Sequence, residues 1–271
     1  MSLLWLWVAL GLYSLGLAHA LVTVALRRAA WFRTGLAAIG LGFFFHFVSL
    51  VEYGLATERF PVTNISEATS LFALLITLGF LLAHWKYDVS SLSVFVFPIV
   101  FVMTLASALS QNVGAEAPPA LRAGWVPIHV SFTLVGYTAL FLACLAGVMY
   151  LIQERELKRR QPRGFYYRLP PLETIDRLGS TTLTIGFPFL TIGILIGAAG
   201  AASAWGPSWL SDPKVMISFV LWFIYLLLIF ARVGAGWRGH KAAVFSIVGL
   251  LMALASWGAN YMSTHHGFLG H

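Results

Sequence analysis

Residues 127–152 read PIHVSFTLVGYTALFLACLAGVMYLI, an apolar run that contains no Asp, Glu, Lys or Arg. An α-helix needs about 20 apolar residues to cross the hydrocarbon core of a bilayer, so this run is long enough to span a membrane. Seven more runs of the same character lie at 3–25, 35–56, 68–85, 91–110, 180–201, 215–232 and 243–262. The sequence therefore predicts an all-α, polytopic bundle of about eight transmembrane helices.

The composition of the chain excludes a soluble protein. Of its 271 residues, 59% are hydrophobic and 10% are charged, whereas soluble domains carry roughly a quarter charged residues. The apolar runs lack the alternation of a barrel strand, and a helix satisfies its own backbone in lipid. A single cysteine, Cys144, excludes a disulfide framework or a cysteine-based metal site. Since no repeat or break in composition divides the chain, we expect one integral membrane domain over residues 1–271.

The basic residues gather at one end of the predicted helices. Only Arg59, Arg122 and Lys214 lie at the other end, which leaves 14 of the 17 lysines and arginines on one side. By the positive-inside rule that side is cytoplasmic, so both termini are expected to face out. This distribution accounts for the net charge of +7 without a nucleic-acid partner. The segment 153–178 is expected to be the sizeable cytoplasmic loop, where three prolines limit helix formation.

A short aromatic and polar segment, WGPSWLSDPK at 205–214, separates the apolar runs at 180–201 and 215–232. Trp205 and Trp209 have two possible explanations. Tryptophan is enriched at membrane interfaces, where its ring is buried and its N–H stays wet. Alternatively, the two rings could hold a flat aromatic cofactor, with Asp212 adding a carboxylate at the apolar boundary. The glycine and prolines of the segment predict a stiff, non-helical lip.

Four histidines are candidate ligands. His129 opens its helix at the predicted outer end, and His265 and His266 follow the last helix on the same side, where the tryptophan segment also lies. Neutral imidazole binds iron well, although a lone interfacial histidine is more often an end group without a ligand. His46 lies near the middle of the second run, where an ionisable group is a functional candidate by default. His46 could bind haem iron, or it could form a hydrogen bond to a neighbouring helix.

Several short motifs occur in an order that resembles the cytochrome c assembly proteins, the haem-handling family with CcsA/ResC, CcmC-type and HemX-type members. The resemblance runs from about His46 to the C-terminus, and the tryptophan segment is similar to the family's WWD signature. The other matching motifs are Pro61-Val-Thr-Asn64-Ile-Ser-Glu67, Pro127-Ile-His129-Val, Gly136-Tyr137, Ile175-Asp176-Arg177-Leu178, Gly186-Phe187-Pro188, Thr191-Ile-Gly193, Trp222-Phe-Ile-Tyr225, Gly236-Trp237-Arg238-Gly239 and Thr264-His265-His266-Gly267-Phe268.

The resemblance implies a haem site at the outer membrane face. The tryptophan segment would form a platform for haem b, and His129 with either His265 or His266 would supply the axial ligands, His265 being preferred. Haem would be presented there for attachment to apocytochrome c, with a ResB/CcsB-like membrane partner. The resemblance thus implies a subunit of a cytochrome c synthase (haem lyase) rather than a stand-alone enzyme, as a multi-pass protein of the bacterial inner (cytoplasmic) membrane.

Three positions depart from the family pattern. Ser211 stands where a tryptophan is expected before the aspartate, and Val215 stands where an acidic residue often follows. Phe230 replaces a membrane histidine, and phenylalanine cannot bind iron. These departures favour a divergent member, so an alternative stays open: a HemX-like accessory or regulatory protein of haem biosynthesis without synthase activity. A third alternative is a transporter or scaffold in which the aromatic lip is purely structural.

Overall fold

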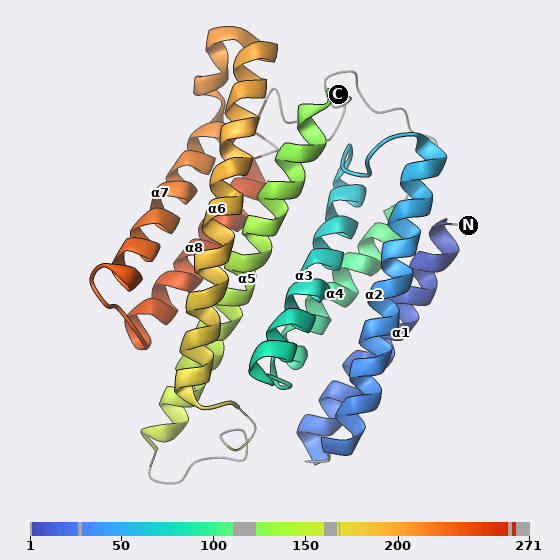
Figure 1. The fold of residues 1–271 in the computed structure, drawn as a ribbon, viewed down its shortest axis with the longest axis vertical. Coiled ribbons are helices and arrows are strands. Elements are labelled where there is room, and N and C mark those ends of the chain that lie inside the picture. Colours follow the sequence, from blue (N-terminus) through green and yellow to red (C-terminus); the bar gives the residue numbers. More distant parts are fainter. Residues whose placement is uncertain are drawn as a thin grey trace. The chain divides into compact units, whose positions relative to one another are not determined.

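A computed structural model of the chain describes residues 2–26, 29–110, 123–159, 167, 169–259 and 262–263, without the side chains of residues 23–31. The described residues form long helices and no strand, which confirms the predicted all-α class (Figure 1). The elements in chain order are α1 (Ser2–Leu26), α2 (Ala29–Thr57), α3 (Ile65–Tyr87), α4 (Leu92–Ser110), α5 (Trp125–Leu157), α6 (Leu172–Trp205), the short 3-10 helix η3 (Gly206–Ser211), α7 (Pro213–Val233) and α8 (His240–Gly258).

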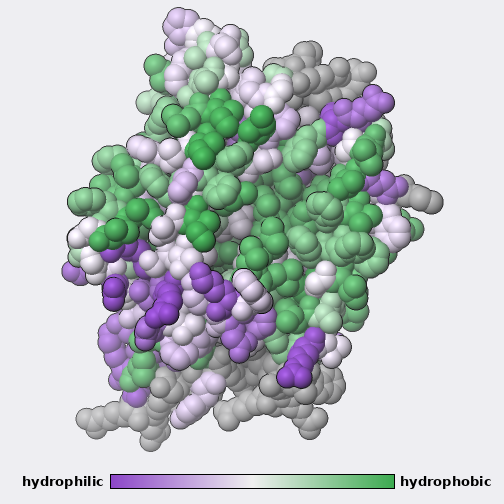
Figure 2. Space-filling view, viewed as in Figure 1, coloured by the Kyte–Doolittle hydropathy of each residue, from purple (hydrophilic) through white to green (hydrophobic). Residues whose placement is uncertain are grey.

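Eight helices of the described part are long and apolar enough to cross a membrane, which confirms the predicted number of spans. Many large apolar side chains on these helices are exposed, as lipid-facing residues would be, and Figure 2 shows hydrophobic residues over much of the visible surface. Examples are Leu55, Phe44, Leu195, Phe223 and Phe230. A surface of this kind suits hydrocarbon rather than water.

The helices fall into two compact units. The first contains α1 to α4, and the second contains α5 to α8 with η3. In the first unit, the fully buried Tyr13 of α1 packs on Phe97 of α4 with 5.9 Å between ring centroids, and Phe97 meets Phe80 of α3 edge-on at 5.1 Å. That the whole chain acts as one domain stays a prediction.

The helix ends differ from the predicted limits around the 153–178 segment. Helix α5 continues to Leu157, and α6 begins at Leu172, so the predicted loop is shorter than expected. Pro170 and Pro171 do not prevent a helix there, because they come directly before its first residue. Proline is tolerated at a helix start, where its missing N–H would have no intrahelical partner.

A buried carboxylate organises the connection between α2 and α3. Glu67 accepts hydrogen bonds from both terminal nitrogens of Arg59 at 2.8 and 2.9 Å, from the Tyr53 hydroxyl at 2.8 Å and from the Thr63 backbone N–H at 2.8 Å. Asn64 caps α3 by accepting from the Glu67 N–H at 2.8 Å. The carboxylate raises the pKa of the Arg59 guanidinium above its ordinary value. The Pro61–Glu67 motif therefore has a structural explanation, as a capped helix start.

We predict that Glu67→Gln destabilises the chain by about 3 kcal/mol, because it removes one partner of a buried, hydrogen-bonded ion pair. Denaturant unfolding in detergent micelles measures the loss. Glu58→Gln, which changes an exposed carboxylate of the same connection, is the matched control and should leave stability within about 0.5 kcal/mol. Equal losses in the two variants would contradict this account.

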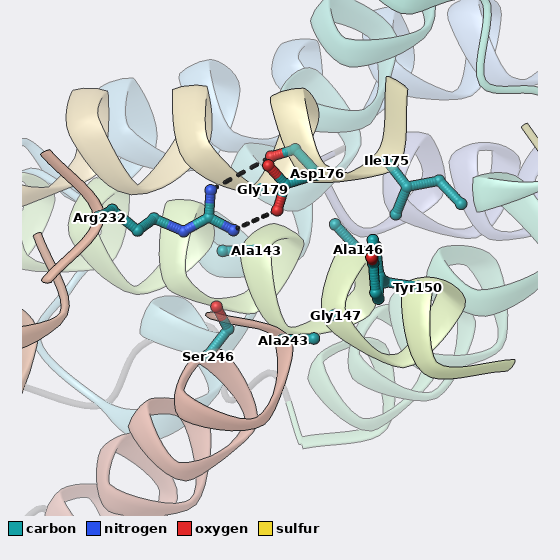
Figure 3. Close-up of a pocket in the computed structure, with 10 residues that line it drawn as sticks. All are labelled: Ala143, Ala146, Gly147, Tyr150, Ile175, Asp176, Gly179, Arg232, Ala243 and Ser246. Carbon is teal, nitrogen blue, oxygen red and sulfur yellow. Dashed lines mark hydrogen bonds and ion pairs between the residues drawn. The ribbon is translucent and has the colours of Figure 1, made fainter. Parts of the chain in front are cut away.

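In the second unit, a buried arginine joins three helices at the end opposite to η3. Arg232 of α7 donates to the Asp176 carboxylate of α6 at 3.1 Å (Figure 3). The same carboxylate oxygen accepts a hydrogen bond from the Gly239 N–H before α8 at 3.0 Å. The adjoining pocket, lined by small residues such as Ala143 and Gly147, encloses a volume of about 10 Å³. Ligand pockets are typically roughly 300–1,000 Å³, so this one fits a helix junction better than a cofactor site.

Candidate functional site

The tryptophan segment forms a tight corner between α6 and α7 (Figure 1). Trp205 is the last residue of α6, and Gly206 takes φ +62° and ψ −155°, a conformation that favours glycine. Residues 206–211 then form the 3-10 helix η3, with Pro207 in its first turn. The prediction that this segment is non-helical is therefore wrong for residues 206–211. Proline fixes φ near −65°, which is compatible with the start of a 3-10 helix.

Trp205 and Trp209 are both partly exposed at this corner. The Trp209 ring lies 6.3 Å from the Phe219 ring of α7, between their centroids. Leu210 beside it is 56% exposed. The corner thus presents apolar and aromatic surface, as both a membrane-interface anchor and a cofactor platform would.

Asp212 has a defined structural task. Its side chain is buried, and one carboxylate oxygen caps α7 by accepting from the N–H groups of Lys214 at 2.9 Å and Val215 at 3.4 Å. The other oxygen accepts from the Ser263 hydroxyl at 2.5 Å. Ser263 lies beyond the end of α8 and two residues before His265. Asp212 therefore ties the chain that follows α8 to the tryptophan corner.

We predict that Asp212→Ala destabilises the second unit by about 1–2 kcal/mol, the usual cost of losing an N-cap residue. Hydrogen–deuterium exchange should show faster exchange at the N–H groups of residues 214 and 215 and at residues 262–263. Asp212→Asn is the control, since asparagine caps a helix as well as aspartate does, and its exchange over 214–215 should stay slow. Equally fast exchange over 214–215 in both variants would rule out the capping role.

His129 lies in the second turn of α5, against α6. Its Nδ1 is 2.7 Å from the backbone carbonyl oxygen of Gly193. The Trp125 ring packs beside the imidazole, with 6.0 Å between centroids and 59° between planes. The side chain is only partly buried by area. Among the described residues, the hydrogen-bond partner of the imidazole is the Gly193 carbonyl, and it contacts Nδ1 rather than Nε2.

His129 shares one end of the second unit with the tryptophan corner. On α6, Trp205 lies eight residues beyond Gly197, the glycine that faces His129, which is about 12 Å of helix. The structure thus brings His129, the tryptophan corner and Ser263 to the same end. His265 and His266 themselves lie outside the described residues.

His46 belongs to the first unit and is fully buried in α2. Its Nε2 lies 2.9 Å from the Ser70 hydroxyl of α3, and its Nδ1 lies 3.3 Å from the Tyr13 hydroxyl of α1. Both ring nitrogens therefore have partners on neighbouring helices, as the hydrogen-bonding alternative predicted. Iron binding at His46 would require one of these two contacts to give way.

Two of the departures from the family pattern lie at exposed positions. Ser211 ends η3 with its hydroxyl donating to the Ser208 carbonyl at 2.7 Å. Phe230 is 68% exposed near the end of α7, at the opposite end of that helix from Asp212. Among the described residues, no three His, Cys, Asp or Glu side chains gather as a metal-ion site. Iron held between two axial histidines does not require such a cluster.

Trp125, Gly197 and Gly200 also belong to this site, although the sequence analysis does not predict them. A Cβ on Gly197 would overlap the His129 ring, and a Cβ on Gly200 would overlap the Trp125 ring. The available signal is spacing, because Gly193 and Gly197 are four residues apart, the pattern by which small residues let membrane helices approach closely. Trp125 is likewise one turn before His129. These two patterns, read together, could have predicted that the His129 face of α5 packs on α6.

Comparison with known proteins gives a consistent result. The family described as "Cytochrome C assembly protein" matches residues 36–266, a range that contains every candidate site residue named above. A "Cytochrome c biogenesis protein CcsA" of Synechococcus sp. (strain CC9902) is 30% identical over 219 residues, 72% of each chain. The protein of that name in Guillardia theta is 27% identical over 75% of this chain and 74% of its own. The protein of that name in Prochlorococcus marinus subsp. pastoris (strain CCMP1986 / NIES-2087 / MED4) is 28% identical over 79% of this chain and 76% of its own.

Proposed function

This chain belongs to the cytochrome c assembly protein family, and from this premise we propose that it binds haem and presents it for attachment to apocytochrome c. The relatives named above are cytochrome c biogenesis proteins, which supports a role in that process. The proposed site is the end of the second unit where His129, the tryptophan corner and the residues after α8 meet. We further propose that this end faces outward from a bacterial cytoplasmic membrane.

The observation that carries the proposal is the hydrogen bond between Ser263 and Asp212. It holds the chain two residues before His265 against the corner formed by Trp205 and Trp209. His129 of α5 lies at the same end of the unit. An iron-binding histidine and partly exposed aromatic rings are groups that suit haem b.

The donor set fits a haem with two axial imidazoles. His129 and His265, or else His266, would hold the iron. Trp205 and Trp209 would lie against the porphyrin. The haem brings the iron and the vinyl groups that react with the acceptor's thiols. The residues of the chain bind it, orient it and keep part of it accessible.

No residue of the chain is assigned a chemical step in this proposal. Attachment then depends on holding haem and apocytochrome c in the right relative position, which fits a subunit of a haem lyase better than a stand-alone enzyme. We propose a ResB/CcsB-like membrane protein as the partner that brings the acceptor. Orientation alone can contribute strongly to a rate, because it replaces an encounter of two free reactants.

The HemX-like alternative is supported by Ser211 and Phe230, which remove one ring of the signature and one membrane histidine. Such a protein would bind haem, or influence haem biosynthesis, without forming cytochrome c. Deletion of the gene separates the two. Loss of covalent haem from c-type cytochromes, restored by the wild-type chain, supports the proposal, whereas unchanged c-type cytochromes with altered haem synthesis would support the alternative.

We predict that the chain purifies with haem and shows a Soret absorption band. His129→Ala and His265→Ala should each reduce haem affinity by about tenfold or more, because each removes an axial ligand. Haem titration followed by absorption measures the change. His19→Ala is the matched control, since it also removes an imidazole but lies in the first unit, where Nδ1 of His19 contacts the Leu15 carbonyl of its own helix at 2.9 Å.

Absence of haem from the wild-type chain, even after expression with excess haem, would contradict the proposed function. Loss of haem in His46→Ala together with retention in His129→Ala would move the site to the first unit. Both outcomes can be read from the same titration.

A further inference from the structure

One face of α6 forms a glycine groove, made by Gly193, Gly197 and Gly200. Their spacing of four and three residues places them on the same side of the helix. Each receives one side chain of α5, in the order Thr133, His129 and Trp125. A Cβ on Gly193 would lie 2.6 Å from the Thr133 hydroxyl and 2.9 Å from its backbone nitrogen. The groove therefore lets the two helices approach closely, as small residues do in membrane proteins.

The groove also determines what His129 can do with its two nitrogens. Nδ1 lies 2.7 Å from the Gly193 carbonyl oxygen, which can only accept a hydrogen bond. The neutral ring must therefore carry its proton on Nδ1, and the lone pair lies on Nε2. Histidines that bind metals commonly donate their other N–H to a carbonyl or carboxylate in this way, which fixes both tautomer and ring orientation.

Two further contacts limit movement of the imidazole. The Trp125 ring lies beside it at 6.0 Å between centroids, and the backbone of α6 at Gly197 is so close that an added Cβ there would overlap the ring. A methyl group on Gly197 would lie 2.4 Å from both Nδ1 and Cε1 of the ring, which is too close for any real contact. The ring could make room only by moving away from the Gly193 carbonyl. The absence of a side chain at 197 is thus a condition for the hydrogen bond.

We propose that Gly193 and Gly197 are positioning residues for His129. The Gly193 carbonyl selects the tautomer with a free Nε2, and Gly197 leaves the space that the ring needs to reach that carbonyl. The consequence for iron binding rests on the proposed function above. The tautomer of His129 does not depend on the proposed function, and it is tested separately.

The direct test is solid-state ¹⁵N NMR on the full chain in lipid, labelled at histidine and prepared without haem. The chain has eight histidines, so the His129 signals are assigned as those lost in His129→Gln. We expect a protonated Nδ1 and a non-protonated Nε2. In Gly197→Ala both tautomers should appear, because the ring has lost its carbonyl partner. A protonated Nε2 in the wild type, or an unchanged spectrum in Gly197→Ala, would overturn the proposal.

Gly179→Ala is the matched control for this test. It makes the same substitution in the same helix, where the added methyl would lie 3.5 Å from the Ala146 Cβ, an ordinary contact. Its His129 signals should match those of the wild type. A tautomer change in Gly179→Ala would show that any added methyl on α6 disturbs His129, and the specific role of Gly197 would fail.

Haem titration of a double-mutant cycle gives the functional test. Gly197→Ala should weaken haem binding by about tenfold, the scale of losing an outer-shell partner of a metal ligand. In a His129→Ala background it should cause no further loss, since Gly197 acts through His129. Losses that multiply in the double variant would indicate a general packing role and contradict the proposal.

The two readouts separate the two proposals. A wild-type chain that binds no haem but shows the expected tautomer would end the proposed function and leave the positioning role intact. If Gly197→Ala alone fails to fold, Gly197→Ala with His129→Ala becomes the decisive variant, because removing the ring also removes the overlap. A double variant that folds supports the proposal, and a double variant that fails to fold contradicts the proposal.

Discussion

The close approach of α5 and α6 is the constraint on which the candidate site depends. Transmembrane helices gain little from hydrophobic association, since lipid is as apolar as their side chains, so contact relies on small residues and on interhelical hydrogen bonds. Here both are present at one place. The glycine groove allows the approach, and His129 uses it to reach the Gly193 carbonyl at 2.7 Å. One imidazole thereby becomes part of the helix packing while its second nitrogen stays available.

Two buried carboxylates show how the motifs of this chain are used. Glu67 and Asp212 are both almost fully buried, and each accepts several hydrogen bonds at the start of a helix. A carboxylate without such partners would be costly in an apolar setting. Their motifs are therefore explained first by structure. For Asp212, a hydrogen bond from the Ser263 hydroxyl also brings Ser263 to the tryptophan corner.

The sequence predicted the number and type of the helices because length and hydropathy decide whether a helix can cross a bilayer. It misplaced the ends of α5 and α6, because charged residues and prolines mark the limit of an apolar run and not the limit of a helix. The 3-10 form of η3 was also missed. It depends on Gly206 adopting a positive φ, a choice that composition does not reveal.

The candidate site was only partly predictable, because contacts between residues distant in sequence decide the surroundings of its histidines. Ligand chemistry identified His129 and His46 alike, but their surroundings differ. Both ring nitrogens of His46 have hydroxyl partners, whereas among the described residues His129 is held through Nδ1 by a backbone carbonyl. That difference arises from neighbours 24 and 33 residues away for His46 and 64 residues away for His129. No local pattern carries such contacts, although the glycine spacing on α6 points towards them.

The central claim is that the second unit holds haem iron through His129. Cryo-electron microscopy of the haem-loaded chain tests it most directly. The account predicts haem density at the tryptophan corner, with iron on Nε2 of His129 and Nδ1 still within hydrogen-bonding distance of the Gly193 carbonyl. Haem bound at His46, or bound at the corner with iron remote from His129, would contradict it.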